Sequence, residues 1–480
     1  MLKINSSIIN LNYKWTALSN TTIGTLMASL DRNIVIIALP NIALDLHVSL
    51  LSLVWIVIGY WVVTACVLLT FGRLADMFGR VKLYNIGFVI FTIGSALCSI
   101  SNTGESLIIF RIIQALGAAF LFSNSAAILT DVFPENERGK ALGLNQVSIV
   151  IGSVVGLALG GFLTSYLGWR SIFWINIPIG IFAIGWSYLK LKELGTIKQE
   201  KIDWLGNITF ASALLFLLIA LTFGSFQIIN SNVTYIFIIG SFSFFLVFYF
   251  IEKKTSKPMF DLDLFKITRF NSGIITIFLN ALARGAFTLV MAFYLQGPTM
   301  HQNPLNAGIY LIPVSLALAI FAPISGILHD KYKLKIFTPL GLILSAIGFF
   351  ILSNIGPTTT IYELVFPLVL VGAGMGIFAS PNRATIMSSV PSFRRGVAAG
   401  MSTMMVMTGS AFSIGLVFFI FIQYITLHDA QSIFTTSYSN SKFSNDITIN
   451  NFIISLHSIF FISGILMIIS IIPSLIKKNN

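Results

Sequence analysis

The chain alternates between long apolar runs and short polar loops, and the lengths of the runs predict helices that cross a membrane. A helix that spans a bilayer needs about 20 predominantly apolar residues. The runs at 204–224 and 234–251 are joined by a short polar loop, which is typical of an inserted hairpin. A Ser-, Thr- and Asn-rich outer loop at 424–452 is expected to be weakly structured. Fourteen helices are predicted, at 15–38, 53–71, 84–101, 106–130, 140–165, 171–190, 204–224, 234–251, 270–296, 306–326, 335–353, 361–380, 397–423 and 453–476.

Composition supports a polytopic membrane protein with an all-α fold. Of the 480 residues, 56% are hydrophobic and 10% are charged, whereas roughly a quarter of the residues in a soluble domain are charged. Cys66 and Cys98 lie inside apolar runs and form neither a disulfide framework nor a metal-binding spacing. The first apolar run is long enough to span and lacks a small-residue cleavage site, so we expect no signal peptide.

The distribution of Lys and Arg predicts the orientation of the helices, because cytoplasmic loops carry an excess of these residues. With a cytoplasmic N-terminus, the basic loops at 190–201 and 253–269 lie inside, and the outer loops contain only Arg170 and Lys442. Both termini are therefore expected to be cytoplasmic. The net charge of +12 is explained by this orientation, and we expect no nucleic-acid partner.

Small and charged residues recur at a nearly constant offset, which predicts an internal duplication. Gly72, Leu74 and Asp76 recur 254 residues later as Gly326, Leu328 and Asp330. At an offset of 257, Gly117, Ser123, Arg138, Gly139, Ala141, Gly143, Gly152 and Ser153 recur as Gly374, Ser380, Arg395, Gly396, Ala398, Gly400, Gly409 and Ser410. We infer an N-terminal six-helix half at 1–190, a two-helix insert with its linkers at 191–269 and a C-terminal six-helix half at 270–480. Many secondary transporters place a midplane site between such repeats.

The polar segment GRLADMFGRVK at 72–82 is expected to be a tight turn between two membrane helices. Gly72 and Gly79 allow helices to approach closely, and the basic side chains place the turn on the cytoplasmic side. Asp76 is placed to accept hydrogen bonds from the free amides of a nearby helix N-terminus. The alternative is an ordinary positively charged loop.

Ionisable residues inside a bilayer are costly and are usually functional, and this chain has four such residues in its apolar runs: Asp31, Arg32, Arg111 and Arg284. Asp31 lies nine residues before Pro40, roughly 13 Å from the outer end of its helix. Arg111 lies roughly 9 Å from the same face. A pair of Asp31 and Arg111 that opens on protonation would couple transport to protons. The alternatives are a static structural pair, or local pairing of Asp31 with Arg32.

Arg284 lies near the middle of the ninth run and close to the repeat counterpart of Asp31, so we expect it to face the same central cavity. The alternative is a hydrogen-bonded structural arginine. One acid against three bases argues against a cavity built only for cations. Uncharged polar residues within the spans are expected to line the cavity or to join helices: Gln114, Asn145, Gln146 and Asn280.

The fifth predicted helix carries a series of glycines that permits close packing and bending: Gly143, Gly152, Gly156, Gly160 and Gly161. Signatures of catalysis do not occur in the sequence. The five histidines are scattered, there is no metal-binding spacing, and no phosphate-binding loop ends in Lys-Ser or Lys-Thr. We therefore expect neither an enzyme nor an ATP-driven pump, and no metal or cofactor.

Several of these segments together resemble a known family. Residues 72–82 resemble the signature loop between helices two and three of the major facilitator superfamily. The segments LDRNIVIIALPNIALDL at 30–46, RIIQALGAA at 111–119 and WRSIFWINIPIG at 169–180 resemble motifs of its fourteen-helix drug:proton antiporter branch. The resemblance implies the major facilitator fold, with two six-helix pseudo-repeats plus two extra central helices.

The resemblance also implies roles for individual residues. Asp76 with Arg73, Gly79 and Arg80 would latch the cytoplasmic side in the outward-facing state. Arg111 would take part in proton coupling, and Asp31 would be the matching acid of the first helix. The glycine series resembles the antiporter motif, although Leu157 stands where that motif has a proline.

The function expected from these observations is proton-coupled export of amphipathic organic compounds or drugs across the cytoplasmic membrane by alternating access. The proton gradient would supply the energy, and the partners would be a small-molecule substrate and the lipid bilayer, with the protein acting as a monomer. Two alternatives remain. One is export of a specific metabolite such as a siderophore, lipid or amino acid, and the other is a non-transporting membrane sensor on the same fold.

Overall fold

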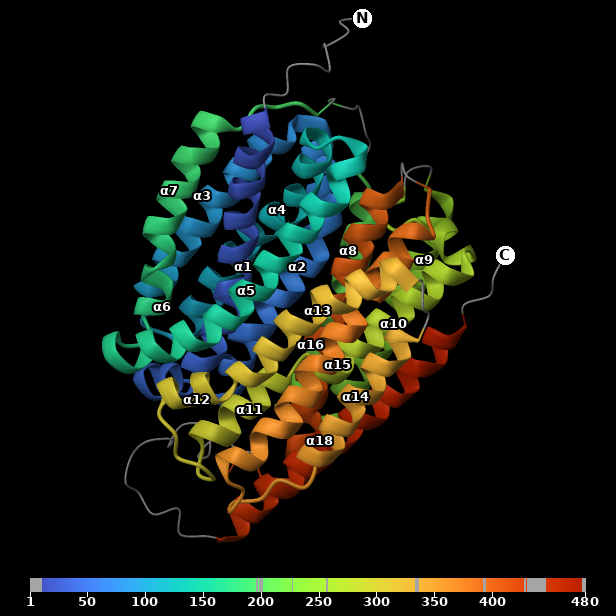
Figure 1. The fold of residues 1–480 in the computed structure, drawn as a ribbon. Coiled ribbons are helices and arrows are strands. Elements are labelled where there is room, and N and C mark those ends of the chain that lie inside the picture. The colour runs from blue at the N-terminus through green and yellow to red at the C-terminus, as the bar shows by residue number, and fades with distance from the viewer. Residues whose placement is uncertain are drawn as a thin grey trace, which may run out of the picture.

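The computed structural model describes residues 11–195, 197, 202–226, 228–255, 258–332, 336–391, 394–426, 429 and 446–476, and all regular elements within them are helices. The N-terminal half comprises α1 (Leu11–Leu46), α2 (Leu50–Phe78), α3 (Arg80–Ser99), α4 (Gly104–Val132), α5 (Glu135–Leu167), α6 (Ser171–Trp174) and α7 (Asn176–Lys190). The insert comprises α8 (Trp204–Ile219), the π-helical turn η1 (Ala220–Gly224) and α9 (Ser231–Lys254). Figure 1 shows the N-terminal half in blue to green beside the later helices in yellow to red.

The C-terminal half begins after the short 3-10 helix η2 (Leu262–Lys266). It comprises α10 (Thr268–Arg284), α11 (Phe287–Gln296), α12 (Pro304–Tyr310), α13 (Ile312–Tyr332), α14 (Phe337–Leu352), α15 (Ile361–Ser388), α16 (Arg395–Tyr424) and α18 (Asp446–Leu475). Several spans are built from two pieces: α6 with α7, α10 with α11, and α12 with α13.

The predicted all-α membrane architecture is confirmed. Thirteen helices in the described part of the chain are long and apolar enough to cross a membrane. The remaining predicted span, at 335–353, is the apolar helix α14, which has 16 residues and packs against α15 and α18. Many large apolar side chains on the outside of the bundle are exposed, as expected where lipid replaces water.

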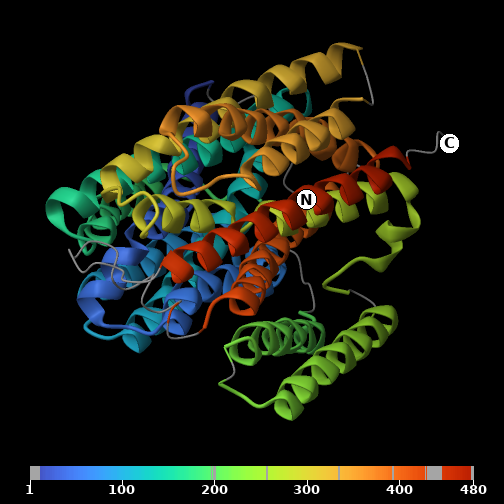
Figure 2. The same ribbon diagram turned by 90° about the horizontal axis from the view of Figure 1, so that it is seen from below.

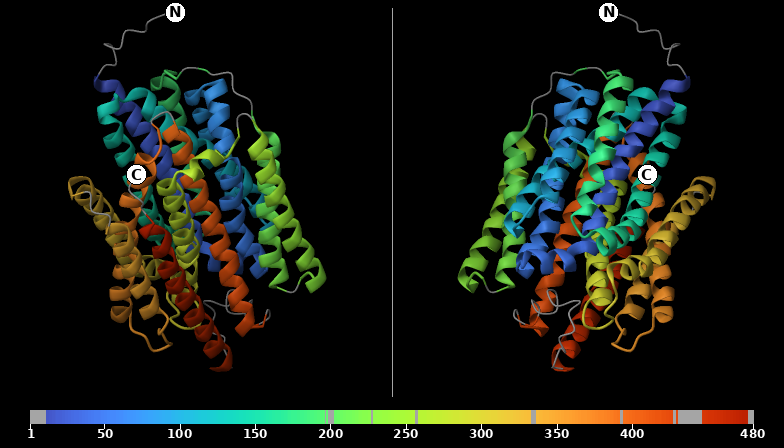
Figure 3. Two further views of the ribbon diagram at one scale, coloured as in Figure 1. Left: turned by 90° about the vertical axis from the view of Figure 1, so that its right-hand side faces the viewer. Right: turned by 90° about the vertical axis from the view of Figure 1, so that its left-hand side faces the viewer.

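The insert at 191–269 forms a helical hairpin at the side of the two halves. Figures 2 and 3 show α8 and α9 as an antiparallel pair beside the main bundle. One face of α8 contacts α2, where the amide of Asn207 donates hydrogen bonds to the Cys66 carbonyl at 2.5 Å and to Thr70 Oγ1 at 3.0 Å. Leu221 of η1 packs against Gly415 of α16. The hairpin therefore touches both halves.

The two halves meet closely at one end of the bundle. We call the end that carries the connection between α2 and α3 the turn end, and the other the opposite end. At the opposite end, Gln296 Nε2 donates to the carbonyl of Ile37 at 3.1 Å. The amide of Leu305 donates to Ser165 Oγ at 3.1 Å, and the backbone at Pro304 lies directly against Gly161. These contacts join the two halves at the opposite end.

Four predicted boundaries are wrong because helices continue further than the apolar runs. Helix α1 continues through Pro40 to Leu46, so its outer end lies 15 residues after Asp31 instead of the predicted nine. Residues 72–78 belong to α2 rather than to a turn, and the connection to α3 is the single residue Gly79. Helix α15 continues through Pro381 to Ser388, so Arg383 lies within a membrane helix instead of a loop. Helix α18 begins at Asp446, inside the predicted loop at 424–452, of which residues 427–428 and 430–445 lie outside the described part. Hydropathy marks the lipid-facing part of a helix, whereas backbone hydrogen bonds extend it into polar sequence.

Candidate functional site

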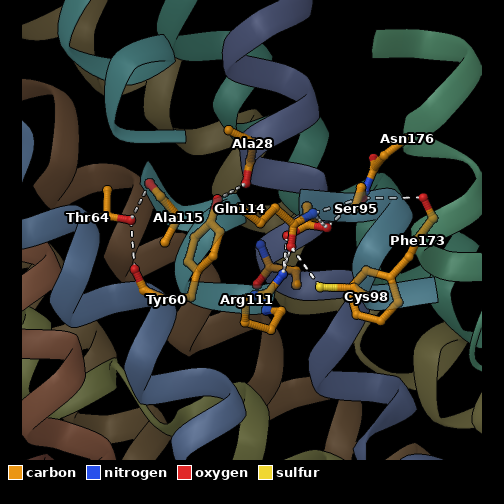
Figure 4. A network of polar contacts seen from close by, with 12 residues as sticks. Ala28, Tyr60, Thr64, Ser95, Cys98, Arg111, Gln114, Ala115, Phe173 and Asn176 are labelled. Carbon is orange, nitrogen blue, oxygen red and sulfur yellow. Dashed lines mark hydrogen bonds and ion pairs between the residues drawn. The ribbon is translucent and has the colours of Figure 1, made fainter. Parts of the chain in front are cut away.

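The structure brings Asp31 and Arg111 together in the interior of the N-terminal half. Figure 4 shows Arg111 of this site with Gln114 and Ser95 beside it. Arg111 Nη1 on α4 lies 2.5 Å from Asp31 Oδ2 on α1. Arg111 is 1% exposed and Asp31 is 0% exposed, so water does not screen their attraction. Removing one partner from a buried ion pair leaves an uncompensated charge. The pair is therefore a junction between α1 and α4 whose strength depends on the charge of Asp31.

Neutral polar groups surround the pair and bond to both of its members, while Arg111 Nε is buried without a hydrogen-bond partner. Gln114 accepts a hydrogen bond from Arg111 at 2.6 Å and donates one to Asp31 Oδ1 at 2.8 Å. Asn176 donates to the same carboxylate oxygen at 2.9 Å. The hydroxyl of Ser95 accepts from both amides, at 2.9 and 3.0 Å. Asp31 thus has three donors, which come from α4 and α7, with Ser95 joining α3 to them.

Sequence reasoning missed Asn176 and Ser95. Asn176 was part of the segment that resembles the antiporter branch, but its side chain was given no role. The structure places Asn176 at the break between α6 and α7, next to the break residue Ile175. An asparagine two residues before Pro178 inside an apolar run is the signal that would have pointed to it.

Aromatic rings flank the guanidinium group of Arg111. Its central carbon lies 4.3 Å from the centre of the Tyr60 ring and 5.9 Å from that of Phe173. Ring faces attract cations, and more strongly when water is excluded. If Asp31 is neutralised, the rings and Gln114 still stabilise the charged arginine, so the cation can persist while the ion pair is lost. This arrangement suits a switch controlled by one proton.

In the C-terminal half, Arg284 has a different setting. It ends α10, and its Nε donates to Asn280 Oδ1 at 2.8 Å, while the amide of Asn280 contacts Met467 of α18. The helix breaks immediately after Arg284, at Gly285 and Ala286, before continuing as α11. The freed amide of Ala286 donates to Ser413 Oγ at 2.9 Å. Discontinuous helices in the membrane often mark binding sites in transporters.

Two further arginines lie at the interface between the halves. Arg32 does not pair with Asp31; its guanidinium stacks on Trp61 of α2, 4.7 Å from the ring centre. Arg383 of α15 donates to Gln146 Oε1 of α5 at 2.5 Å, a bond that joins the two halves. Arg383 lies beyond the predicted span at 361–380, and the sequence analysis gave it no role.

The glycine series packs α5 against α1. A Cβ added at Gly152 or Gly156 would lie 2.7 or 2.8 Å from the carbonyl oxygens of Leu26 and Leu30, respectively. Gly160 packs against Ile34 in the same way, whereas Gly161 faces α12 of the other half, and Gly143 has open space beside it. Helix α5 is continuous from Glu135 to Leu167, and the carbonyl of Leu157 lies against Gly308 of α12.

Asn145 joins helices within the N-terminal half. Its amide donates to Thr25 of α1 at 3.2 Å and to Ser125 of α4 at 2.9 Å, and it is 3% exposed. Of the four uncharged residues predicted to line a cavity or join helices, Gln114 and Asn145 bond within the N-terminal half and Asn280 bonds within the C-terminal half. Gln146 joins the halves.

Comparison with known sequences decides the family. The profile of the Major Facilitator Superfamily matches residues 21–416, well over half of the chain. The chain belongs to the Major Facilitator Superfamily. Its similar proteins include the riboflavin transporter RibZ of Clostridioides difficile, which is 33% identical over 88% of this chain and 92% of that protein. They also include multidrug resistance protein 3 of Bacillus subtilis, 32% identical over 78% of this chain and 73% of that protein.

Solved structures agree on the fold of this superfamily member. A bacterial homologue of the human lysosomal transporter Spinster, in an inward-facing and unoccupied conformation, matches with a TM-score of 0.68 and 15% identity over 97% of both chains. The xylose transporter XylE from E. coli matches with a TM-score of 0.60 and 15% identity, over 96% of this chain and 97% of that chain.

The superfamily signature segment at 72–82 forms a charged cluster at the turn end. Arg80 donates to Asp76 at 2.8 Å and to Asp131 of α4 at 2.6 Å. Gly79 has a φ of +105°, a conformation that favours glycine. The free amides at the start of α3 are capped by Glu193, which accepts from Arg80 at 3.0 Å and from Val81 at 2.9 Å. The sequence led us to expect that Asp76 accepts hydrogen bonds at a helix N-terminus. At the start of α3, Glu193 accepts them instead.

A second contact ties the signature segment to the insert. Arg73 donates to the carbonyl of Pro258, in the linker that follows α9. That linker also carries Asp261, which lies 3.0 Å from Arg394 just before α16. The linker therefore connects α2 of the N-terminal half with α16 of the C-terminal half at the turn end. No cluster of three metal-binding side chains occurs among the described residues of this superfamily member.

Proposed function

We propose that this superfamily member is a proton-coupled exporter of amphipathic organic compounds that works by alternating access in the cytoplasmic membrane. The observation that supports the proposal most directly is the fully buried pair of Asp31 and Arg111. An ionisable pair in a membrane interior is costly and usually functional. Similarity to multidrug resistance proteins supports export of such compounds.

In the proposed mechanism, a proton binds Asp31 and removes its negative charge. The attraction to Arg111 is then lost, and α1 and α4 are free to shift relative to each other. Because α1 also packs on α5, which contacts α12 across the interface, a shift of α1 reaches the opposite end. Gln114 and Asn176 would reorient the neutral carboxyl group and preserve the site for the next proton.

We place the turn end at the cytoplasmic side, with both termini inside. In this orientation the two halves contact each other on the outer side. The cluster of Gly72, Arg73, Asp76, Gly79 and Arg80 would stabilise the cytoplasmic side in the alternate, outward-facing state. The protein would act as a monomer with no cofactor and would use the proton gradient as its energy source.

The test uses purified protein in liposomes with an imposed pH gradient. Proton release is followed with a pH-sensitive dye while cationic, neutral and anionic amphipathic compounds are supplied in turn. We expect compound-dependent proton movement with the wild-type protein and none with Asp31→Asn, while exchange of compound without a gradient persists. The matched control is Asp45→Asn, an acid on the same helix that is about half exposed and pairs with Arg170. Unchanged coupling in Asp31→Asn would remove the pair from the mechanism.

Export or import of one specific metabolite is the second candidate function. It is favoured by the 33% identity to a protein named as a riboflavin transporter. The two functions differ in substrate range. Gradient-dependent movement of several unrelated compounds supports multidrug export, whereas movement of a flavin alone supports the second candidate.

A further inference from the structure

Two deep arginines at the interface between the halves have no carboxylate partner. Arg32 on α1 stacks on Trp61, and Arg284 on α10 bonds to the amide of Asn280. Neither forms an ion pair with any described residue. Asp31, the acid nearest in sequence, is fully committed to Arg111, Gln114 and Asn176. The N-terminal pair is therefore neutral as a unit, and the two arginines contribute uncompensated positive charge.

Arg32 and Arg284 occupy equivalent positions in the two halves. Gly152 packs on Leu26 and Leu30 of α1, and Gly409 packs on Phe278 and Leu282 of α10, each 252 residues later. The same offset of 252 separates Arg32 from Arg284. Two like charges in a poorly solvated interior are unfavourable unless an opposite charge joins them. Both side chains keep a partly accessible surface, although Asp31 beside Arg32 is completely enclosed. An anion that entered between the halves would contact both guanidinium groups and supply the opposite charge.

Hydrogen-bond donors at the same place are left without acceptors. Arg32 Nε and Trp61 Nε1 are both buried and have no hydrogen-bond partner. Buried donors without partners are rare in proteins, and each one calls for an explanation. The central carbon of the Arg32 guanidinium lies 4.7 Å from the centre of the Trp61 ring, and its unpartnered Nε remains for a ligand oxygen. Guanidinium edges match the two oxygens of a carboxylate.

Local structure also fixes the position of Arg284. Asn280 orients its Nε, and the end of α10 at Gly285 leaves the arginine at a break in the membrane helix. The interface contains a third arginine, Arg383, which is held by Gln146 from the opposite half on the side of the turn end. It places additional positive charge along the interface between the turn end and the central pair.

We propose that Arg32 and Arg284 bind the carboxylate, or a similar oxyanion, of an amphipathic substrate, so that the compounds this protein moves include organic anions. The inference rests on the proposed transport function and specifies the charge of its substrate. The ring of Trp61 supplies an apolar wall beside the charged contact. The substrate carboxylate replaces the missing counterion of the two arginines, whereas a cationic compound would be repelled from them.

The test compares three probes of nearly equal size that differ in charge: dansylglycine, which is an anion, dansylglycinamide, which is neutral, and dansyl-ethylenediamine, which is a cation. Binding to the purified full chain is measured by energy transfer from tryptophan to the dansyl group, without a pH gradient. We expect the wild-type protein to bind the anion roughly tenfold more tightly than the neutral amide, as for hydrogen bonds between charged groups. The cation should bind most weakly.

Substitutions then assign the selectivity to the two arginines. In the double variant Arg32→Gln and Arg284→Gln, affinity for dansylglycine should fall to that for the amide, while affinity for the amide changes by less than about twofold. The double variant Arg32→Lys and Arg284→Lys keeps both charges and should retain part of the preference. The control Lys190→Gln removes an exposed charge at the end of α7 and should not alter it.

Three results would overturn the proposal. The first is equal or weaker binding of the anion by the wild type, including no saturable binding. The second is an equal loss for all three probes in the glutamine variant, which would show a structural role. The third is complete displacement of dansylglycine when gluconate in the buffer is replaced by chloride, which would identify an inorganic-anion site. Because no gradient is used, failure of proton coupling leaves this result unchanged.

Discussion

The two halves of the molecule share a fold but treat their buried charge in different ways. In the N-terminal half, Arg111 and Gln114 of α4 form an ion pair and hydrogen bonds with α1. At the repeat offset of 257, these positions correspond to Leu368 and Val371 of α15, which are buried apolar residues. The C-terminal half therefore has no counterpart of the pair of Asp31 and Arg111. Duplication preserved the packing while the charged chemistry diverged.

The corresponding helices differ in the same way. Helix α1 is continuous through Asp31, whereas its counterpart is broken between α10 and α11 at Gly285. Gly152 packs on Leu26 of α1 and Gly409 packs on Phe278 of α10, so the two helices correspond at an offset of 252, which matches Asp31 with Ala283. A continuous helix with a fully bonded acid suits a switch, and a broken helix that ends in Arg284 suits a binding site. We infer that the N-terminal half senses the proton and that the C-terminal half supplies charge to the substrate site.

The largest expected effect is the difference in folding stability between a substitution of Arg111 and one of Arg284. Arg111→Met leaves the carboxylate of Asp31 buried without its ion-pair partner, which should cost about 3–5 kcal/mol of folding stability. Arg284→Met leaves no carboxylate without an ion-pair partner. It should cost less than about 1 kcal/mol of folding stability, because it removes an uncompensated charge. Thermal unfolding of the purified variants measures both effects, and only Arg111→Met should show a large fall in Tm.

The double variant Asp31→Asn and Arg111→Met is the control for this comparison. It removes both charges, so most of the lost stability should return if the orphaned carboxylate is the cause. Equal destabilisation by Arg111→Met and Arg284→Met would contradict the contrast between the halves, because it would show that both arginines are equally embedded in their own half.

The architecture and the pair of Asp31 and Arg111 were predictable from sequence. Apolar runs specify spans because backbone groups in lipid must bond within the helix. A buried acid and a buried base at similar depth on two helices are expected to pair with each other. The repeat of small residues likewise predicted equivalent packing, and Gly152 and Gly409 do occupy equivalent contacts.

The remaining parts of the site depend on geometry that hydropathy does not encode. Asn176 reaches Asp31 only because the span breaks between α6 and α7. Arg32 neighbours Asp31 in sequence, yet successive residues on a helix point about 100° apart, so it meets Trp61 instead. Arg383 lies outside the predicted span at 361–380, although α15 continues past Pro381 to Ser388.

Glycine-to-alanine substitutions test a property that the two halves share, the close packing of two helices at a glycine. A Cβ at Gly152 would lie 2.7 Å from the carbonyl oxygen of Leu26, and one at Gly409 would lie 2.8 Å from that of Phe278. Gly152→Ala and Gly409→Ala should therefore destabilise the protein by similar amounts, about 1–3 kcal/mol each, because backbone must move. Gly143→Ala, which meets open space, should be neutral or slightly stabilising. The measurement is again Tm, and a loss confined to one half would break the structural symmetry.

The smallest expected effect concerns the turn end, where the halves differ again. Glu193 caps the start of α3 by accepting hydrogen bonds from the amides of Arg80 and Val81. The corresponding helix of the C-terminal half, α14, begins after Ile336, whose own side chain makes no cap hydrogen bond. A carboxylate at a helix N-terminus contributes about 0.3–1 kcal/mol at an exposed site. Glu193→Gln keeps an acceptor but removes the charge, so amide hydrogen exchange at the start of α3 should accelerate by up to about fivefold. Exchange at the start of α14 should not change, and acceleration at both helices would show that Glu193 acts on the whole bundle instead of on one cap.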